Sequence, residues 1–320
     1  MKVSIVIPTL NCAEVLKQCL ISIRENDTKY DYEIIVVDGS SKDYTADVAR
    51  KFADKVLVED TFYRGVNRNK GVKAASGEII CFTDSDCIVP RNWIDSLVDS
   101  LINLNKKDPK IVGVGGGNLP YVPDNADIAE LAISYTLRSS LVSFRARNMM
   151  ERYSNPVEVS HNPPMNSALF KDKILEVGGF CEENNVGEDL ILDARIKSKG
   201  YKLYAIPGCE VLHKHRSNFE KLRKQMFSFG RARVRTGRKY KSFFSWYHFG
   251  PAILCIFSFS PLFFAPLLLS LMNGIYVSFK NKKPLLFSYA FLATWITYIS
   301  YGLGEIYELI FGRRDKGLSY

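Results

Sequence analysis

The sequence predicts an α/β domain followed by a C-terminal region of membrane-spanning helices. In the first 215 residues short apolar strands alternate with amphipathic helices, and residues 243–279 contain no Lys, Arg, Asp or Glu. Buried strands that alternate with helices form a mostly parallel sheet with helices on both faces. The length of 320 residues, 47% of them hydrophobic, is enough for one such domain and an appendage.

Short apolar runs that end in turn residues predict the strands, and apolar residues at helical spacing predict the helices. In Asn11–Asn26, for example, Val15, Cys19 and Ile23 recur on one face. The predicted strands are Lys2–Pro8, Tyr32–Asp38, Lys55–Glu59 and Glu78–Thr83, and the helices between them are Asn11–Asn26, Asp43–Ala53 and Gly65–Ala75.

Cysteine usage and the N-terminus exclude several classes of protein. The seven cysteines stand singly, without a CxxC pair, which argues against a disulfide scaffold and a zinc ribbon and favours a reducing compartment. The apolar start of the chain, MKVSIVIPTL, is too short for a signal peptide and lacks a cleavage site.

Polar side chains follow three of the predicted strands. Thr9 and Asn11 follow the first, Asp38 ends the second, and Asp84-Ser85-Asp86 comes after the fourth. Ligands of such sheets bind beyond the carboxyl ends of the strands. A pair of carboxylates suits Mg²⁺ or Mn²⁺, which keep coordination positions open for phosphate oxygens. This edge is therefore the predicted site, with a divalent metal held by the two acids of the triplet.

Other residues at this edge have two interpretations each. Asp38 either accepts hydrogen bonds from a base or ribose or caps the next turn, and Arg68 either pairs with a pyrophosphate or is a solvated helical residue. The chain contains no Walker A motif, no GxSxG motif and no GxGxxG motif after a strand. The glycines at 115–117 lack the spacing and the helix of a dinucleotide loop.

Residues 127–150 have helical spacing and contain neither Pro nor Gly. This segment, Asp127–Met150, either lines a substrate cleft as a membrane-facing helix or packs as an ordinary helix.

A basic segment, residues 214–241, precedes the charge-free tract. It holds eleven Lys and Arg and one acid, so the rest of the chain is near neutral while the whole carries +9. Ser217 and Glu220 fit a capping box that starts a helix. Its apolar stripe either lies in the interface of an anionic membrane or packs on the domain. The stripe comprises Phe219, Leu222, Met226 and Phe229. A nucleic-acid partner is not expected, because a basic run beside a membrane anchor meets lipid or phosphate.

The tail has the composition of membrane-spanning segments. The 37 residues of 243–279 would form a helix of roughly 55 Å against a hydrocarbon core of about 30 Å. Pro251, Pro261 and Pro266 argue against one straight helix, and a second apolar run, Pro284–Gly304, follows. We therefore expect two spans, with three as the alternative, and a cytoplasmic basic segment. The competing interpretation is a pair of buried helices.

Several stretches of the first 215 residues form a recognisable series. They are VSIVIPTLN (3–11), EIIVVDGSSKDYT (33–45), RNKGVKAASGEIICFTDSDC (68–87), NSALFKDKILEVGGF (166–180), GEDLILDARIKSKGYKL (187–203) and VLHKH (211–215). In order and spacing they resemble family 2 glycosyltransferases, which have the GT-A fold, a Rossmann-like fold of nucleotide-diphospho-sugar transferases. The resemblance covers most of residues 1–215. We therefore divide the chain into a GT-A domain (1–215), a basic amphipathic interfacial segment (216–242) and transmembrane helices (243–320).

The resemblance also implies roles by position. The residues implied to bind the donor nucleotide are Pro8, Thr9, Asn11, Asp38, Arg68, Asp84 and Ser85. The implied ligands of Mn²⁺ or Mg²⁺ are Asp84, Asp86 and His213, the last with His215 as a rival. Asp189, next to Glu188, matches the catalytic base of inverting members.

The chain also departs from the family pattern. Gln225 and Arg231, which we expect to bind acceptor or phosphate, fall where processive relatives carry a Gln-x-x-Arg-Trp motif, and the motif itself is absent. Processive synthesis is therefore not expected. Val37-Asp38 replaces the usual double acid, and Ile191 stands where a further acid is common.

The expected activity is metal-dependent, inverting transfer from a nucleotide-diphosphate sugar, UDP by resemblance, to a hydroxyl of a lipid-linked glycan or glycolipid. A hydroxyl needs a base such as Asp189, whereas a lipid phosphate is already ionised. The alternatives are a polyprenyl-phosphate glycosyltransferase and an inactive membrane scaffold that binds sugar nucleotides. A nucleotidyltransferase would carry a Gly-rich basic loop after the first strand, where this chain has PTLNCAEV. We expect membrane lipid as a partner and a multi-pass protein of the cell membrane with a cytoplasmic catalytic domain.

Overall fold

The computed structural model describes residues 1–61, 63–121, 126–143, 154–183, 186–214, 218–240 and 246–312. The chain forms two compact units, one of Met1–Tyr121 and Arg147–Lys214, the other of Val122–Ala146 and His215–Tyr320. The second unit thus takes in residues 122–146, which the sequence analysis assigned to the first domain. Each unit is described by itself.

The first unit is built on a mostly parallel sheet. Within the described residues its eight strands follow the order β3-β2-β1-β4-β9-β6-β10-β8. Strands β8 and β9 run opposite to the other six. The bounds are β1 (Lys2–Thr9), β2 (Asp31–Asp38), β3 (Lys55–Val58), β4 (Ile79–Thr83), β6 (Ile111–Gly115), β8 (Val157–Val159), β9 (Asn166–Phe170) and β10 (Lys202–Ala205).

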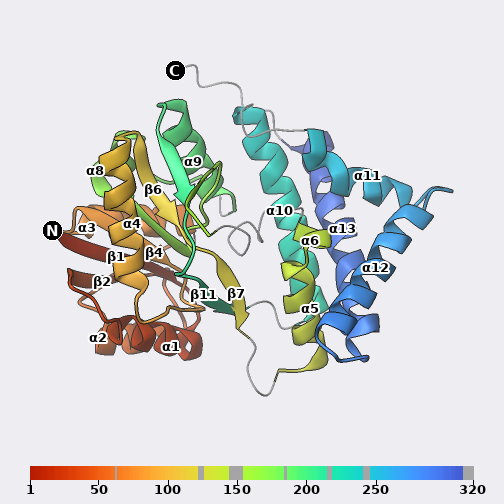
Figure 1. Ribbon diagram of the computed structural model, residues 1–320, viewed down its shortest axis with the longest axis horizontal. Helices are drawn as coiled ribbons and strands as arrows, with labels where there is room; N and C mark the ends of the chain where they lie inside the picture. Colours follow the sequence, from red (N-terminus) through yellow and green to blue (C-terminus); the bar gives the residue numbers. More distant parts are fainter. Residues whose placement is uncertain are drawn as a thin grey trace. The chain divides into compact units, whose positions relative to one another are not determined.

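Helices cover both faces of this sheet. Because side chains alternate along a strand, Val3, Ile5 and Ile7 of β1 enter one core with α1, α2 and α4, while Val6 enters the other with α3, α8 and α9. Figure 1 shows α1 and α2 on one side of the sheet and α8 and α9 on the other. The bounds are α1 (Ala13–Arg24), α2 (Thr45–Phe52), α3 (Arg64–Ala74), α4 (Trp93–Lys107), α8 (Lys171–Glu176) and α9 (Glu188–Ser198).

The strands and helices predicted between residues 2 and 83 are all present, and their boundaries differ from the predicted ones by one or two residues. All seven cysteines lie in described parts of the chain and are free thiols, six of them buried. None of them forms a disulfide, as their isolated positions in the sequence predict.

A small sheet beside the large one was not predicted. Its strands, in the order β5-β11-β7, are β5 (Cys87–Ile88), β11 (Val211–Lys214) and β7 (Asn118–Tyr121). β11 pairs antiparallel with β5, and this pairing places His213 opposite Cys87. Strand β11 therefore brings residues from the end of the first unit to the turn that follows β4.

The second unit is helical. Its elements are α5 (Ile128–Arg138), α6 (Ser140–Ser143), α10 (Phe219–Lys239), the 3₁₀ helix η2 (Trp246–Phe249), α11 (Gly250–Phe257), α12 (Phe264–Lys280) and α13 (Leu286–Phe311). Helix α13 packs against α5, α10, α11 and α12. A Cβ on Gly304 would lie 2.1 Å from the carbonyl oxygen of Phe227, and one on Gly230 would lie 2.0 Å from that of Tyr301. Glycine at both positions lets the backbones of α10 and α13 approach closely.

The predicted membrane-spanning helices are not found. Among the described residues no helix combines the length and the apolar character that crossing a membrane requires. The charge-free tract is divided between α11, of 8 residues, and α12, of 17, with a turn at Pro261 between them. Helix α13 has 26 residues but mixes Thr, Tyr, Ser and Gly among its apolar side chains and contains Glu305 and Glu308.

Two further predictions for the second unit need correction. The helix expected over 127–150 ends at Arg138, because Ser139 is extended (ψ 135°); a short helix, α6, follows, and residues 144–153 lie outside the described part. Helix α10 begins after Asn218, whose side chain accepts the amide hydrogen of Lys221 at 2.9 Å, so Asn218 is its N-cap. Ser217, the predicted cap, lies outside the described residues.

The apolar stripe of α10 is used for packing within the unit. Leu222 and Met226 are buried in one cluster with residues of α5 and α13, and Phe219 and Phe229 pack against that cluster. The stripe is therefore not exposed for a membrane interface, contrary to the interfacial segment predicted over 216–242. The stripe is packed, as the alternative predicts, and its partners are helices of the second unit.

Candidate active site

The carboxyl ends of β1 and β2 are joined by a buried hydrogen-bond network. Thr9 and Asp38 stand opposite each other in the parallel register, directly after Pro8 and Val37, and Thr9 Oγ1 donates to Asp38 Oδ1 at 3.0 Å. The backbone N–H of Ser41 donates to Asp38 Oδ2 at 2.9 Å, and its hydroxyl donates to Oδ1 at 2.5 Å. Asp38 thus organises the turn after β2, as its capping interpretation predicts, while staying at the predicted edge.

Asn11 connects the two loops beside this network. Its backbone N–H donates to Ser41 Oγ at 2.8 Å, and its Oδ1 accepts the N–H of Lys42 at 2.8 Å. Asn11 has φ of 48°, in the left-handed region that Asn tolerates better than most residues. Three residues predicted to bind the donor nucleotide therefore fix one another's positions through this network: Thr9, Asn11 and Asp38.

The acidic triplet forms the turn between β4 and β5. The backbone N–H of Cys87 donates to the carbonyl of Asp84 at 3.1 Å, which closes a turn around Ser85 and Asp86. The two carboxylates separate from there: Asp84 bonds to Arg68, and Asp86 turns toward β11.

Arg68 lies at the centre of a group of acids and is buried rather than solvated. Its Nη2 donates to Asp84 Oδ1 at 2.8 Å and its Nη1 donates to Glu188 Oε1 at 2.6 Å. Its guanidinium also stands over the ring of Phe180, 5.5 Å from the centroid. Burial by itself would lower the pKa of Arg68, but the carboxylates of Asp84, Glu188 and Asp189 raise it.

Close packing of α3 brings this arginine to α9. A Cβ on Gly65 would lie 2.0 Å from the carbonyl oxygen of Cys181 and 3.4 Å from the Cβ of Glu188, so glycine is required at this contact. Glu188 is the first residue of α9 and is buried. Burial, with Asp189 beside it, raises the pKa of Glu188 despite the opposing charge of Arg68. Glu188 therefore fixes the position of Arg68. The side chain of Glu188 lies inside the site rather than at the surface.

Asp189 lies in the first turn of α9, after Gly187, which caps the helix in a left-handed conformation (φ 87°). Its Oδ1 accepts the N–H of Leu190 at 2.8 Å, and its side chain is partly exposed. Acidic residues are stabilised at a helix N-terminus, where the backbone N–H groups point toward them. Asp189 is thus partly accessible to solvent, whereas its neighbour Glu188 is buried.

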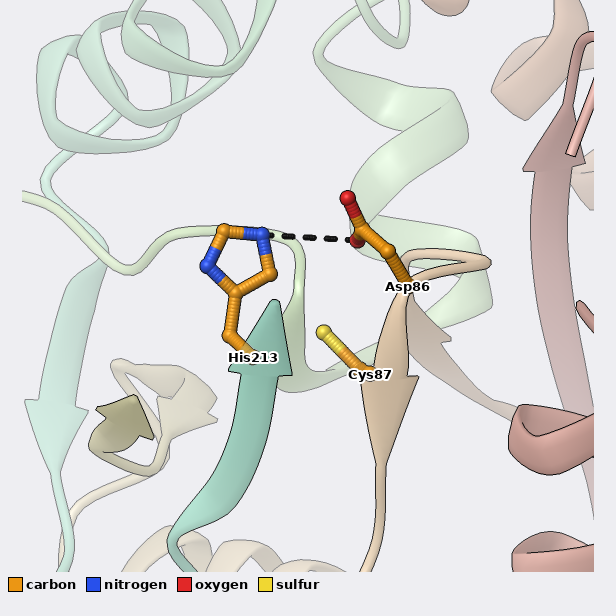
Figure 2. Close-up of side chains that lie close together, drawn as sticks. All are labelled: Asp86, Cys87 and His213. Carbon is orange, nitrogen blue, oxygen red and sulfur yellow. Dashed lines mark ion pairs between the residues drawn. The ribbon is translucent and has the colours of Figure 1, made fainter. Parts of the chain in front are cut away.

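Asp86, Cys87 and His213 converge at the small sheet (Figure 2). His213 Nε2 lies 3.4 Å from Asp86 Oδ1, and one donor atom from each of the three residues lies within 4.8 Å of the others. Burial, together with the nearby Asp86 and Asp84 carboxylates, raises the pKa of the Cys87 thiol well above its usual value, so this thiol stays protonated at neutral pH.

The donor atoms present fit a divalent cation. A carboxylate oxygen and an imidazole nitrogen are ligands that Mn²⁺ accepts, whereas thiolate sulfur suits softer metals. Of the three predicted ligands, Asp86 and His213 come together, while Asp84 is held by Arg68. His215, the rival of His213, lies outside the described residues.

The two residues predicted to bind acceptor or phosphate lie in the second unit. Arg231 Nε donates to Glu308 Oε2 at 2.9 Å, and its guanidinium stands over the ring of Tyr307. The Oε1 atom of Gln225 is buried and has no hydrogen-bond partner within the described part of the chain. Arg231 thus fastens α10 to α13.

Residue-by-residue inspection of the sequence missed two features of the first unit. Asp193 is buried one helical turn after Asp189, and His161, in the segment between β8 and β9, contacts both. Cys87 was also not foreseen beside His213. The spacing of Asp189 and Asp193, four residues apart on one helix, was the signal available for the first feature.

Comparison with known proteins agrees with this architecture. Residues 4–173 match the family model described as Glycosyl transferase family 2. The chain is 28% identical over 243 residues to glycosyltransferase AglE of Haloferax volcanii, covering 72% of this chain and 73% of that protein. It is 26% identical over 298 residues to the dolichyl N-acetyl-α-D-glucosaminyl phosphate 3-β-D-2,3-diacetamido-2,3-dideoxy-β-D-glucuronosyltransferase of Methanococcus voltae, covering 88% and 89%.

A solved structure shares the fold. The mannosyltransferase PcManGT from Pyrobaculum calidifontis, in complex with GDP-Man and Mn²⁺, superposes with a TM-score of 0.59 at 18% identity, over 98% of this chain and 88% of that chain. The predicted GT-A-like α/β fold with a large, mostly parallel sheet is thereby confirmed. The family match, which spans more than half of the chain, shows that this protein belongs to glycosyl transferase family 2 and is a glycosyltransferase.

Proposed function

We propose that the protein transfers a sugar, with inversion, from a nucleotide-diphosphate sugar to a hydroxyl of a lipid-linked glycan or glycolipid. The observation that carries the proposal is the cluster at the carboxyl edge of the sheet, where Arg68 binds Asp84 and Glu188 while Asp189 stays partly exposed. Such an edge is where open α/β sheets bind their ligands.

Asp189 is the proposed general base. In an inverting transfer the acceptor oxygen attacks the anomeric carbon from the face opposite the leaving diphosphate, and its proton must be removed. The partly exposed carboxylate at the start of α9 suits this task, and the buried Glu188 next to it does not.

Asp86 and His213 are the residues that would hold a divalent metal, Mn²⁺ or Mg²⁺. When bound, such an ion offsets charge that develops on the leaving diphosphate. Thr9, Asn11 and Asp38 shape the loops in which we place the nucleotide. The resemblance to UDP-sugar enzymes favours UDP, whereas the similar solved structure holds GDP-Man, so both donors belong in the test.

Thermal stabilisation tests donor and metal together. We expect one sugar nucleotide from a panel of UDP-, GDP- and dTDP-sugars to raise the Tm in the presence of Mn²⁺; at 100 times its Kd a ligand adds about 2.7 kcal/mol. The Asp86→Asn variant should lose the Mn²⁺-dependent part, and Asp172→Asn, an exposed acid on α8, should keep it. A donor that binds Asp86→Asn as tightly as the parent in Mn²⁺ would contradict the metal site.

The acceptor is tested with Asp189→Asn. For a hydroxyl acceptor, loss of the base should lower kcat by about 10²–10⁴-fold while donor affinity stays the same. A polyprenyl phosphate needs no base, so full transfer to such a phosphate by Asp189→Asn would replace the hydroxyl acceptor with a phosphate acceptor. NMR of the anomeric configuration in the product tests inversion.

We also propose that the second unit binds the surface of an anionic membrane, on the cytoplasmic side of the cell membrane, where a lipid-linked acceptor lies. At the turn between α12 and α13, Phe279 and Leu285 are 85% and 74% exposed. Three lysines lie between them in the sequence, at positions 280, 282 and 283. Exposed apolar side chains beside basic ones bind the interface of anionic lipid, through burial of the former and attraction to the latter.

Vesicle co-sedimentation tests this surface. The full chain should bind vesicles that contain phosphatidylserine more strongly than neutral vesicles, and a Phe279→Ser, Leu285→Ser double variant should bind several-fold more weakly. A matched double variant at exposed apolar residues of the first unit, Val58→Ser with Leu175→Ser, should bind like the parent. Equal binding to neutral and anionic vesicles, or no effect at Phe279 and Leu285, would overturn the proposal.

A further inference from the structure

His161 lies between two carboxylates of α9. Its Nδ1 is 2.7 Å from Asp193 Oδ2, and its Nε2 is 3.8 Å from Asp189 Oδ2. Asp189 and Asp193 are four residues apart, so they lie one above the other on the same face of the helix. One imidazole therefore contacts both the proposed base and a second acid behind it.

The second acid is a fixed acceptor. Asp193 is 3% exposed, and its Oδ2 also accepts the backbone N–H of Asn162 at 2.9 Å. A buried carboxylate that already accepts one N–H favours the imidazole tautomer that donates from Nδ1. Nε2 then carries the lone pair, and this is the nitrogen that faces Asp189.

We propose that His161, fixed by Asp193, is a positioning residue that receives the proton which Asp189 takes from the acceptor. This inference rests on the proposed function of Asp189 as the base. A histidine whose Nδ1–H is held by a carboxylate takes up a proton at Nε2 in the Ser-His-Asp triad.

The proton that leaves the acceptor passes through Asp189 to His161. The acceptor oxygen forms a bond to the anomeric carbon, the bond from that carbon to the diphosphate oxygen breaks, and the diphosphate leaves with the electron pair. The acceptor proton moves to Asp189 Oδ2 and from there to His161 Nε2, which restores the carboxylate. The imidazolium lies between two carboxylates, which favour its charge. His161 is 29% exposed, so it returns the proton to water.

The 3.8 Å separation exceeds a direct hydrogen bond. A rotation of the Asp189 carboxylate shortens this distance, or one water molecule bridges it. Catalytic hydrogen bonds are commonly long before substrate binds.

Two single variants distinguish proton transfer from Asp189 to His161 from a purely structural role of His161. In His161→Asn the side-chain amide takes the place of Nδ1 and keeps the bond to Asp193, but nothing replaces Nε2. We expect kcat to fall about 10-fold or more, with unchanged donor Kd, acceptor KM and Tm. Asp193→Asn should also lower kcat, because the amide oxygen still accepts from Asn162 and Nδ1 but no longer carries the negative charge that stabilises an imidazolium. The matched control is the exposed Asp172→Asn, which should keep kcat.

Chemical rescue provides the decisive measurement. With His161→Ala, added imidazole should restore kcat in a saturable way, because the position is open to solvent. 1,2,4-Triazole has the same ring shape and much lower basicity, so it should restore far less. Equal rescue by both rings, no rescue by imidazole, or a His161→Asn variant within twofold of the parent would overturn the inference.

Failure of this inference can be told apart from failure of the proposed function. If Asp189→Asn loses transfer while His161→Asn keeps it, Asp189 is the base and His161 is not its partner. If Asp189→Asn keeps transfer to a hydroxyl acceptor, the proposed base itself is wrong.

Discussion

The guanidinium of Arg68 lies 2.6 Å from the carboxylate of Glu188, although 120 residues separate them in the chain. This ion pair joins α3 to the first residue of α9 and thereby fixes where Asp189, the next residue, stands relative to the end of β4. A second bond, from Arg68 to Asp84, ties the same guanidinium to the acidic turn. The proposed base and the proposed donor edge are therefore held by one buried cation.

Removal of that cation should destabilise the protein strongly. Arg68→Ala leaves Glu188 buried without its partner, and such a loss costs about 3–5 kcal/mol. Urea denaturation should show this as a lower midpoint. The control is Arg50→Ala, which breaks an exposed pair with Asp47 and should change the free energy of unfolding by less than about 1 kcal/mol. Similar losses for the two variants would contradict the central role of Arg68.

The metal requirement should depend on His213 and not on Cys87. His213→Asn should raise the Mn²⁺ concentration needed for half-maximal activity by about 10-fold or more, because one ligand is lost. Cys87→Ser should leave it unchanged, since Mn²⁺ and Mg²⁺ prefer oxygen and nitrogen ligands to sulfur. A large change in Cys87→Ser would place sulfur among the ligands and argue for a softer metal.

Glu33 should make the first unit acid-sensitive. Burial raises its pKa, but hydrogen bonds from Ser4 and Ser76 and the ammonium of Lys55 lower the pKa to about 2. A carboxylate whose pKa is lowered in the folded state stabilises the protein at pH values above its pKa in the unfolded state, near 4.5. This contribution is lost as the pH falls toward 2. The free energy of unfolding should therefore fall less between pH 5 and 2 in Glu33→Gln than in the parent, by roughly 3 kcal/mol. Glu14→Gln, at an exposed position of α1, is the control, and it should follow the parent curve.

Glu305 should have the opposite effect in the second unit. Burial raises its pKa to about 8, although the N–H of Ala252 and the charge of Arg233 act against this. A carboxyl whose pKa is raised in the folded state makes its full contribution to stability at pH values below its pKa in the unfolded state, near 4.5. This contribution is lost as the pH rises through 8. Stability should therefore decline from pH 5 to pH 8 more steeply in the parent than in Glu305→Gln, a difference of at least about 1 kcal/mol. Parallel curves for the two proteins would refute a protonated Glu305.

The sequence by itself determined the strands and helices of residues 2–83 and the edge at which the polar residues gather. These elements are set by local periodicity and by turn residues such as the Gly39-Ser40-Ser41 run, and parallel strands bring their carboxyl ends to one edge whatever the rest of the chain does. Thr9, Asp38 and Asp84 could therefore be predicted at the site without coordinates.

Only the tertiary structure decided which of those side chains work together. Asp84 forms an ion pair with Arg68, and Asp86 lies beside His213. Asp189 meets His161 because the segment between β8 and β9 contacts α9. The same holds for the second unit, where a charge-free tract that suggested membrane spans is divided between two helices, and the stripe of α10 is buried by α5 and α13. Composition and spacing report how apolar a segment is, whereas its partner depends on contacts between residues far apart in the chain, and those contacts arise only when the chain packs.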